Sequence, residues 1–272
     1  MFPIFDSHAH YTSHQFDADR HDLLQSLPAQ GVVGVVECAT HYDTCLQALE
    51  LARQYPWIWA AVGIHPESLI EEDAATQTHF HGDWAAELKA IQALAEDPRV
   101  VAIGECGMDH HWPIPHEAQL ALFEAQLRLA RELDKPIIIH DREAHADVYA
   151  LLKKYRPKGV VHCYSGSADD AAWISAQGMY IGFGGAVTFK GAKRAVKAVQ
   201  ALPMESILLE TDCPYMAPEP CRGQRCHSGL IQHTGQFIAQ AKGMDPNDVF
   251  AAALDNAQRL FLSNQRFEEE PE

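Results

Sequence analysis

The chain has 272 residues, 47% of them apolar and 21% charged, an ordinary globular mixture that excludes wholesale disorder and suits one large domain. Lys and Arg number 21 against 37 Asp and Glu, a net charge of −16. Such a chain does not bind polyanions by diffuse attraction, so any contact with nucleic acid needs positive charge supplied locally.

Eight short apolar or β-branched runs recur along the chain, each almost free of charge in its middle. Such runs are typical of parallel strands that are buried on both faces of a sheet. In chain order they cover residues 3–8, 32–38, 58–64, 100–105, 136–140, 159–162, 179–183 and 207–212.

Amphipathic stretches separate these runs. The clearest covers residues 117–134, where Leu120, Phe123 and Leu127 recur at helical spacing. The others cover residues 43–54, 83–96, 144–155, 169–177, 192–201, 231–242 and 245–261. Strand–helix alternation predicts a parallel sheet, and eight repeats of roughly 30 residues predict a closed (β/α)8 TIM barrel. An open doubly wound sheet is the alternative, although no GxGxxG follows the first run.

No linker, repeat or low-complexity segment divides the chain. Residues 1–265 are therefore expected to form one domain, and residues 266–272 a solvated acidic tail. The start of the chain lacks a basic signal-peptide region, and no apolar run approaches the ~18 residues that span a bilayer. Seven scattered cysteines fit a reduced compartment. We expect a soluble cytoplasmic protein without membrane contact or a disulfide-linked partner.

Polar residues of metal-ligand type end five of the eight runs. They are His8 and His10 at the first, Glu105 at the fourth, His140 at the fifth, His162 at the sixth, and Glu210 and Asp212 at the eighth. Each alone is more readily explained as a packed core or rim residue. In a barrel, however, these strand ends converge on the face that carries active sites, and His with carboxylate is a ligand set for first-row divalent ions.

Four histidines and two carboxylates exceed what one open catalytic ion needs. Two ions about 4 Å apart with one bridging carboxylate fit the set better. Cys106, Cys163 and Cys213 each directly follow one of these residues. If the strands continue, these cysteines point to the opposite face, so we expect them to pack against helices and not to bind metal.

The motifs around these residues form an ordered set. They are Asp6-Ser-His8-Ala-His10, Gly63-Ile-His65-Pro66, Gly104-Glu105-Cys-Gly107-Met-Asp109, Ile-Ile-His140, His162-Cys-Tyr-Ser-Gly166 and Glu210-Thr-Asp212-Cys-Pro214-Tyr215. This set resembles the TatD-type metal-dependent deoxyribonucleases, which belong to the amidohydrolase-like TIM barrels. The resemblance extends from Asp6 to Phe261 and so covers nearly the whole chain.

The resemblance implies two divalent ions (Zn²⁺, Mn²⁺ or Mg²⁺) and hydrolysis of DNA phosphodiester bonds, often as a 3′→5′ exonuclease on single strands or 3′ ends. One ion would be held by His8, His10, Glu105 and Asp212, and the other by Glu105, His140 and His162, with Glu105 bridging. The catalytic residues would be Asp212, Glu105, His65 and Glu210. The residues that bind substrate would be His65, Arg222, Lys190 and Asp109.

One loop departs from the family pattern. After the eighth strand the family usually continues Arg-Gly-x-x-Asn-x-Pro; here Arg222-Gly223 is kept, but Cys226 and Ser228 stand at the Asn and Pro positions. The departure bears on substrate range rather than on metal binding. Two alternatives stay open: an ester or amide hydrolase with the same dinuclear site, such as an aminoacyl-tRNA deacylase, and a metal-binding barrel without activity.

Positive charge for DNA is predicted after the seventh run, where Lys190, Lys193, Arg194 and Lys197 recur at helical spacing. Apolar residues on the opposite helix face must contact the sheet, so most of this stripe is expected to face solvent. Lys190 comes first, at the barrel mouth, where barrels often bind phosphate. Lys197 lies about 10 Å further along, beyond the Debye length of ~8 Å. Lys190→Ala is therefore expected to raise KM for DNA several-fold, and Lys197→Ala to change it less than about twofold.

Overall fold

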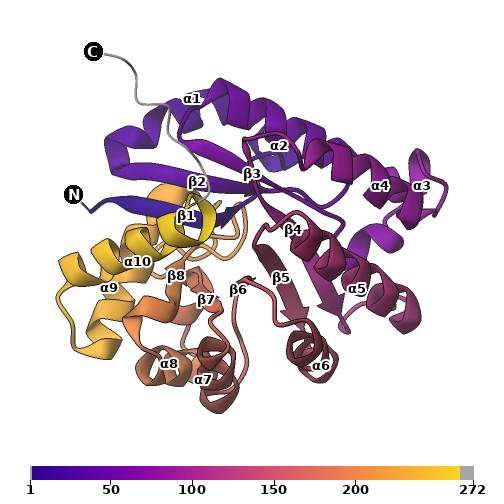
Figure 1. Ribbon diagram of the computed structural model, residues 1–272. Helices are drawn as coiled ribbons and strands as arrows, with labels where there is room; N and C mark the ends of the chain where they lie inside the picture. Colours follow the sequence, from indigo (N-terminus) through magenta and orange to yellow (C-terminus); the bar gives the residue numbers. More distant parts are fainter. Residues whose placement is uncertain (1, 264–272) are drawn as a thin grey trace.

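The computed structural model describes residues 2–263 and contains eight parallel strands in the order β1 to β8, each paired with its neighbours in the sequence. Helices lie outside the strands (Figure 1). The strands are β1 (Ile4–Ala9), β2 (Val32–Cys38), β3 (Ile58–Val62), β4 (Val100–Asp109), β5 (Ile137–Arg142), β6 (Gly159–Val161), β7 (Tyr180–Phe183) and β8 (Ile207–Leu209).

The helices follow the strands in alternation. They are α1 (Arg20–Ser26), α2 (Tyr42–Gln54), α3 (Ala75–Thr78), α4 (Trp84–Leu94), α5 (His116–Glu132), α6 (His145–Tyr155), α7 (Ala168–Ala176), α8 (Lys193–Ala201), α9 (Ile231–Lys242) and α10 (Pro246–Phe261). Short 3₁₀ turns connect them: η1 (His14–Phe16), η2 (Pro28–Gln30), η3 (Pro66–Leu69), η4 (Gly185–Thr188), η5 (Met204–Ser206) and η6 (Ser228–Leu230).

The sheet closes on itself just beyond the end of β8. The Asp212 N–H donates to the His8 carbonyl oxygen and the His10 N–H donates to the Cys213 carbonyl oxygen, each over 2.9 Å. Ala9 and Cys213 form a parallel bridge at the same place. The predicted (β/α)8 barrel is therefore confirmed, and the open sheet is excluded. Closure also brings the ligand candidates of the first and last strands side by side.

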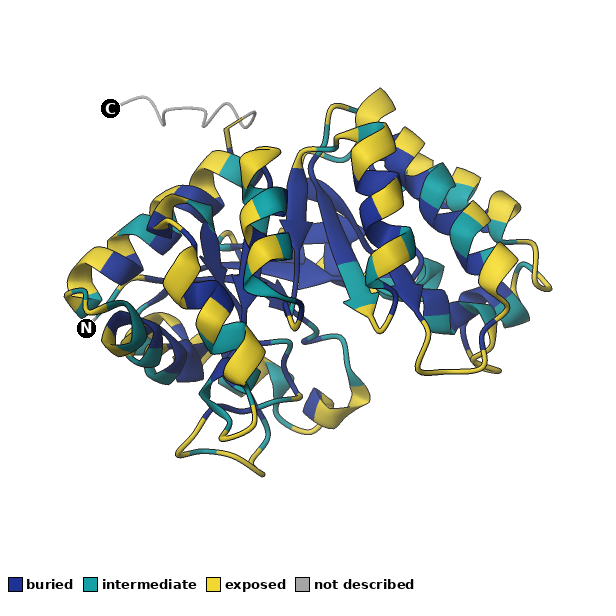
Figure 2. Cartoon of the chain, turned by 90° about the horizontal axis from the view of Figure 1, so that it is seen from below, coloured by how far each residue is buried: buried dark blue, intermediate teal, exposed yellow. Residues whose placement is uncertain are grey.

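The barrel interior is apolar towards its amino-terminal end. Side chains from several strands meet there, together with residues of α10: Phe5, Val36, Trp59, Val101, Ile138, Val160, Leu208, Ala257 and Phe261. The Phe5 ring stacks on those of Trp59 and Phe261. It fits because residue 34 is glycine, where a Cβ atom would lie 2.3 Å from the Phe5 ring. Figure 2 shows the buried strands between helices that expose their outer faces.

Alternation along the strands places polar residues directly above this apolar layer. Ile138 is followed two residues later by His140, and Val160 by His162. Because side chains two apart on a strand share a face, both histidines enter the barrel at its carboxyl-terminal mouth. The fold thus separates a dry, packed base from a polar mouth.

Some predicted boundaries were wrong. β4 continues to Asp109 instead of ending at Glu105, because its pairing with β5 extends through Asp109 and Arg142. β8 ends at Leu209, before the predicted 212. No helix was predicted where α1 lies. The proposed domain boundary at 265 and the tail 266–272 lie outside the described residues.

Two further expectations concern the surroundings of the protein. All seven cysteines are free thiols, as predicted. None of the helices in the described part of the chain is long and apolar enough to cross a membrane.

Candidate metal centre

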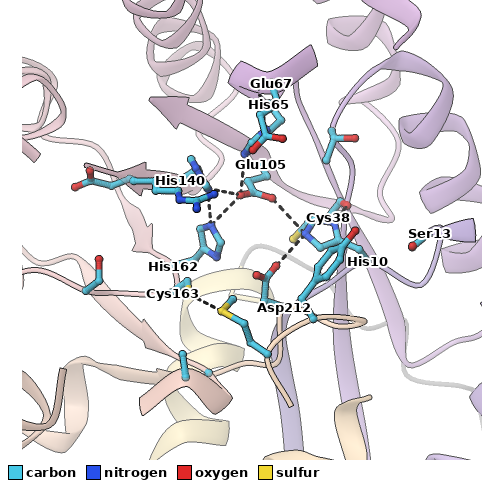
Figure 3. Close-up of a pocket in the computed structure, with 18 of the residues that line it drawn as sticks. His10, Ser13, Cys38, His65, Glu67, Glu105, His140, His162, Cys163 and Asp212 are labelled. Atoms are coloured by element: carbon cyan, nitrogen blue, oxygen red, sulfur yellow. Dashed lines mark hydrogen bonds and ion pairs between the residues drawn. The ribbon is translucent and has the colours of Figure 1, made fainter. Parts of the chain in front are cut away.

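The six predicted ligands converge at the mouth of the barrel, around a cavity of about 1800 Å³. Five of them line this cavity, and His8 lies fully buried beside them. Figure 3 shows the side chains of His10, Glu105, His140, His162 and Asp212 pointing toward one another from the carboxyl ends of different strands or from just beyond them. Glu105, which comes from β4, lies in their midst, and its two carboxylate oxygens face different neighbours.

Oxygen Oε2 of Glu105 faces the first group of donors. It lies 3.2 Å from His8 Nε2 and 3.3 Å from His10 Nε2. The two imidazole nitrogens are 3.0 Å apart. Asp212 Oδ1 completes the group at 3.7 Å from His8 Nε2 and 3.3 Å from His10 Nε2.

Oxygen Oε1 of Glu105 faces a second group. It lies 2.8 Å from His162 Nε2 and 3.0 Å from His140 Nδ1, and these two nitrogens are 3.4 Å apart. His65 Nε2 also approaches the same oxygen, at 3.4 Å. The sequence prediction placed His65 on the substrate and not among these donors.

Donor chemistry and spacing in both groups fit divalent cations. Nitrogen and oxygen ligands held about 2.0–2.2 Å from one ion lie roughly 3 to 3.7 Å from one another. The distances within each group fall within or close to this interval. Imidazole together with carboxylate suits Zn²⁺ and Mn²⁺. Either group could therefore hold a cation, with Glu105 available to both.

The far ring nitrogens of two histidines fix which atom is free to bind metal. His10 Nδ1 lies 2.8 Å from the Cys38 carbonyl oxygen, which can only accept, so His10 presents a lone pair at Nε2. His140 Nε2 lies 2.9 Å from Asp109 Oδ2 and is thereby protonated, which leaves Nδ1 free toward Glu105. Such outer contacts orient metal-binding histidines.

The same reasoning separates His65 from the ligands. Its Nδ1 accepts the Glu67 backbone N–H over 3.2 Å, so the neutral ring carries its proton on Nε2. Nε2 is the atom that faces Glu105 and the cavity. With this tautomer His65 presents a hydrogen-bond donor toward the cavity, and its phosphate contact stays a prediction.

Electrostatics keep both central carboxylates ionised. Burial would raise the pKa of Glu105, but the surrounding imidazole groups, His162 above all, hold that pKa well below its usual value. Burial opposes ionisation of Asp212 as well, and the neighbouring imidazoles of His10 and His8 keep the Asp212 pKa low. Burial lowers the pKa of His8 to about 4, so this ring is neutral and able to bind a cation.

Two of the predicted site residues lie behind the cavity. Asp109 was expected to bind substrate, but its side chain is fully buried behind His140, and its Oδ1 accepts the backbone N–H groups of His111 and Trp112. Glu210, expected among the catalytic residues as a support for the site near Asp212, is also fully buried and lies 3.9 Å from His162 Nδ1. We propose that Asp109 positions His140, whose Nε2 lies 2.9 Å from its carboxylate.

The surroundings of Glu210 disfavour its charged form. Burial raises its pKa to about 8. Its Oε1 accepts the Cys163 N–H over 2.5 Å, and its Oε2 has no hydrogen-bond partner within residues 2–263. A Cβ atom at Gly182 would lie 2.2 Å from that oxygen, so the glycine in β7 makes room for the carboxyl group.

We expect Asp109→Asn to weaken metal binding by roughly 10- to 100-fold, the usual effect of losing an outer carboxylate–histidine contact. Asn preserves the acceptor for the turn at residues 111–112 but no longer accepts from His140 with a full charge. Competition between the protein and a chromogenic chelator for Zn²⁺ measures the affinity.

The matched control is Asp17→Asn, which changes an exposed carboxylate 3.0 Å from His14 Nδ1 and outside the cavity. Its affinity should stay at the wild-type value. If wild type and Asp109→Asn bind Zn²⁺ with equal affinity, Asp109 does not position His140 for metal binding.

A buried hydrogen-bond network, which the sequence did not reveal, joins the first strand to the segments that follow the last strand. Asp6 accepts the Thr211 N–H over 3.0 Å and the hydroxyls of Thr211 and Ser228 over 2.7 Å. The Ser228 N–H also donates to the Tyr11 hydroxyl over 2.8 Å. Proline, the family residue at position 228, has no N–H to donate. Ser228 therefore places a hydrogen-bonded residue where the family has a rigid proline. The proposed metal-binding side chains keep their positions.

Of the three cysteines expected to pack against helices, two do so and one does not. Cys106 and Cys213 are fully buried and lie in the apolar core, as expected. Cys163 instead lines the cavity. β6 ends at Val161, and Cys163 has φ 45°, so strand alternation no longer applies at this position.

The cationic wall of the cavity also differs from the prediction. Lys193, Arg194 and Arg222 line the cavity, whereas Lys190 is exposed outside it. α8 begins only at Lys193, and its first turn faces the mouth. Ala192 and Ala195, expected against the sheet, line the cavity as well.

Comparison with protein families and with curated proteins finds relatives over the full chain. The family model described as TatD related DNase matches residues 5–262. A Bacillus subtilis protein described as an uncharacterized metal-dependent hydrolase is 37% identical over 268 residues, which cover 96% of this chain and 100% of that protein. The 3′-5′ ssDNA/RNA exonuclease TatD of Citrobacter rodentium is 36% identical, covering 95% and 97% of the two chains.

Solved structures show the same architecture. A TatD homologue from Escherichia coli superposes with a TM-score of 0.85 at 30% identity, covering 95% of this chain and 98% of the other. A TatD-family hydrolase from Entamoeba histolytica reaches a TM-score of 0.82 at 20% identity, covering 96% and 99%, and so supports the fold alone.

Proposed function

We propose a function for this chain on the premise that it belongs to the TatD related DNase family. It hydrolyses phosphodiester bonds at an end of single-stranded DNA. For this reaction it uses two divalent cations bridged by Glu105. Family membership makes the chain a metal-dependent hydrolase. The observation that carries the rest is the division of Glu105, whose two oxygens face separate donor groups at 2.8 to 3.4 Å.

Each cation has its own set of holding residues. His8, His10, Glu105 and Asp212 would hold one, and Glu105, His140 and His162 the other. The ions would be Zn²⁺, Mn²⁺ or Mg²⁺. When bound, they would neutralise phosphate oxygens and supply a water of near-neutral pKa.

Residues of this chain then bind and orient the substrate. His65 Nε2–H would donate to a phosphate oxygen, because its other nitrogen already accepts from Glu67. Arg222 lines the cavity and packs over the Phe189 ring, 4.2 Å from its centroid, which holds the guanidinium ready for a bidentate phosphate contact. Asp212 is ionised and borders the cavity, and so would take the proton of the attacking water.

The cationic residues that line the cavity are expected to set affinity for DNA. Lys193→Ala/Arg194→Ala should raise KM several-fold, by about threefold to tenfold, because two charges beside the bound strand are lost. The kcat value should change little, since neither residue faces Glu105 or Asp212. Steady-state kinetics on single-stranded DNA at physiological salt measures both constants.

Lys190→Ala and Lys197→Ala serve as matched controls, because both residues belong to the same basic stripe but lie outside the cavity lining. Each should change KM by less than about twofold. This replaces the effect predicted for Lys190 from sequence. Equal effects from all these variants would mean that the whole stripe guides DNA.

Lys193 and Arg194 line the cavity and form no salt bridge within residues 2–263, which favours an anionic substrate over the neutral ester or amide of the rival hypothesis. We infer that the protein acts in the cytoplasm, and its seven free cysteines support a reducing compartment.

One assay tests the proposed function. Protein stripped of metal is restored with Mg²⁺, Mn²⁺ or Zn²⁺ and incubated with end-labelled single-stranded DNA. A ladder of products shortened from one end is expected. No cleavage with any ion, together with rapid hydrolysis of ester or amide substrates, would establish the rival function instead.

A further inference from the structure

Opposite sides of the cavity mouth carry opposite charge. Four carboxylates that line the cavity belong to the segment that follows β3, and we call them the acidic wall: Glu67, Glu71, Glu72 and Asp73. The basic wall consists of Lys193 and Arg194, which follow β7, and Arg222, which follows β8. β3 and β7 are four strands apart in a closed barrel of eight. The two walls therefore face each other across the mouth.

Neither wall is neutralised by its surroundings. Within residues 2–263, no carboxylate of the acidic wall forms a salt bridge, and neither does Lys193 or Arg194. The nearest carboxylate to Arg222 is Glu219, at 3.9 Å. Elsewhere on the rim, Asp141 and Arg142 are adjacent in β5, and Asp43 lies 3.2 Å from His79 Nδ1. The two walls therefore carry the clusters of like charge at the mouth.

The acidic wall begins immediately beside the proposed phosphate contact. Glu67 donates its backbone N–H to His65 Nδ1, and Glu71, Glu72 and Asp73 follow as exposed side chains. These carboxylates already repel one another: partial burial and then the charge of Glu67 raise the pKa of Glu71. A further anion at this place meets several like charges within about one Debye length of ~8 Å.

DNA carries one phosphate for every nucleotide. A strand that is cut internally would continue in both directions from the scissile phosphate, so its next phosphate would lie against one wall or the other. On the basic side this phosphate is attracted. On the acidic side it is repelled, whereas a terminal nucleoside with a free hydroxyl carries no further phosphate and is accepted.

We propose that the acidic wall confines cleavage to the last bond of a strand by rejecting any phosphate beyond the terminal nucleoside, while the basic wall holds the body of the strand. This inference rests on the proposed function, and it assigns end specificity to electrostatic repulsion at Glu71, Glu72 and Asp73. The site needs no steric plug to act only at ends.

Three single-stranded substrates of one sequence test the inference: a linear strand with free terminal hydroxyls, the same strand with phosphate on both ends, and its closed circle. The wild type should cleave the free-ended strand at least about tenfold faster, in kcat/KM, than the phosphorylated one. It should leave the circle uncut.

The variant Glu71→Gln/Glu72→Gln/Asp73→Asn removes three charges from the acidic wall. It should bring the ratio of the two linear rates at least about threefold closer to one, because the terminal phosphate is no longer repelled. Glu72→Lys, a single exposed substitution, should move the ratio in the same direction. Because the readout is a ratio, a general loss of activity does not imitate it.

The matched control is Glu96→Gln/Glu132→Gln/Glu205→Gln, which makes the same change in net charge at exposed positions outside the cavity. This variant should keep the wild-type ratio. An unchanged ratio in the wall variants, an equal shift in the control, or ready cleavage of the circle by the wild type would overturn the inference and leave the proposed function standing. Failure of the wild type to cut any of these strands with any metal would overturn the proposed function, and the inference with it.

Discussion

Replacing Glu105 by alanine is expected to remove both metal ions and nearly all turnover. Its two oxygens are the one feature shared by the two donor groups, at 3.2 Å from His8 Nε2 and 2.8 Å from His162 Nε2. Without this carboxylate the second group has no anion left and the first keeps only Asp212, so both groups hold a dication more weakly. Plasma mass spectrometry of the purified variant measures the metal content, and DNA cleavage measures turnover.

Glu105→Gln should behave in the same way, because it keeps the shape and loses the charge. Glu96→Ala, an exposed carboxylate outside the cavity, serves as the control and should retain both ions. Full metal occupancy in Glu105→Ala would contradict the bridging role.

Asp212→Asn is expected to lower kcat by about 10²- to 10⁴-fold, the range typical of a lost general base. Asn still offers an oxygen to a cation, but it cannot take up the proton of the attacking water. KM should change much less than kcat, since the phosphate contacts of His65 and Arg222 remain. Kinetics with saturating Mn²⁺ separates the two constants.

Asp141→Asn is the matched control: Asp141 also lines the cavity, but its carboxylate lies 2.7 Å from His145 Nδ1 and belongs to neither donor group. Its kcat should stay within a few-fold of the wild-type value. If Asp212→Asn keeps kcat within about tenfold, the proton has another acceptor.

Strands and barrel closure followed from sequence because the signal was local and repeated. Each strand contains a short run rich in apolar residues between amphipathic helices, and eight such units leave few arrangements. The boundaries were less predictable. β4 extends past Glu105 because its partner β5 continues beside it to Arg142, a tertiary effect that no local pattern encodes. α1 has one buried residue, Leu24, and so carries almost no periodic signal.

The donor set was predictable because metal ligands end buried strands, where an unpaired charge is costly. The roles of Asp109 and Glu210 were not, since sequence spacing does not distinguish a carboxylate facing the cavity from one behind a histidine. Both proved fully buried. Lys193 and Arg194 were missed for a related reason: helical spacing identified the basic stripe, but it did not show that α8 begins only at Lys193 and that its first turn lines the cavity.

A titration of metal-free protein with Mn²⁺ tests the central claim most directly. The number of Mn²⁺ ions bound per chain and the cleavage of end-labelled single-stranded DNA are measured in the same samples. Because Glu105 lies between two donor groups, we expect two ions to bind per chain. Release of single nucleotides from one end of the strand should begin only when the second ion binds. Full cleavage with one ion bound would contradict the dinuclear site and the bridging role of Glu105.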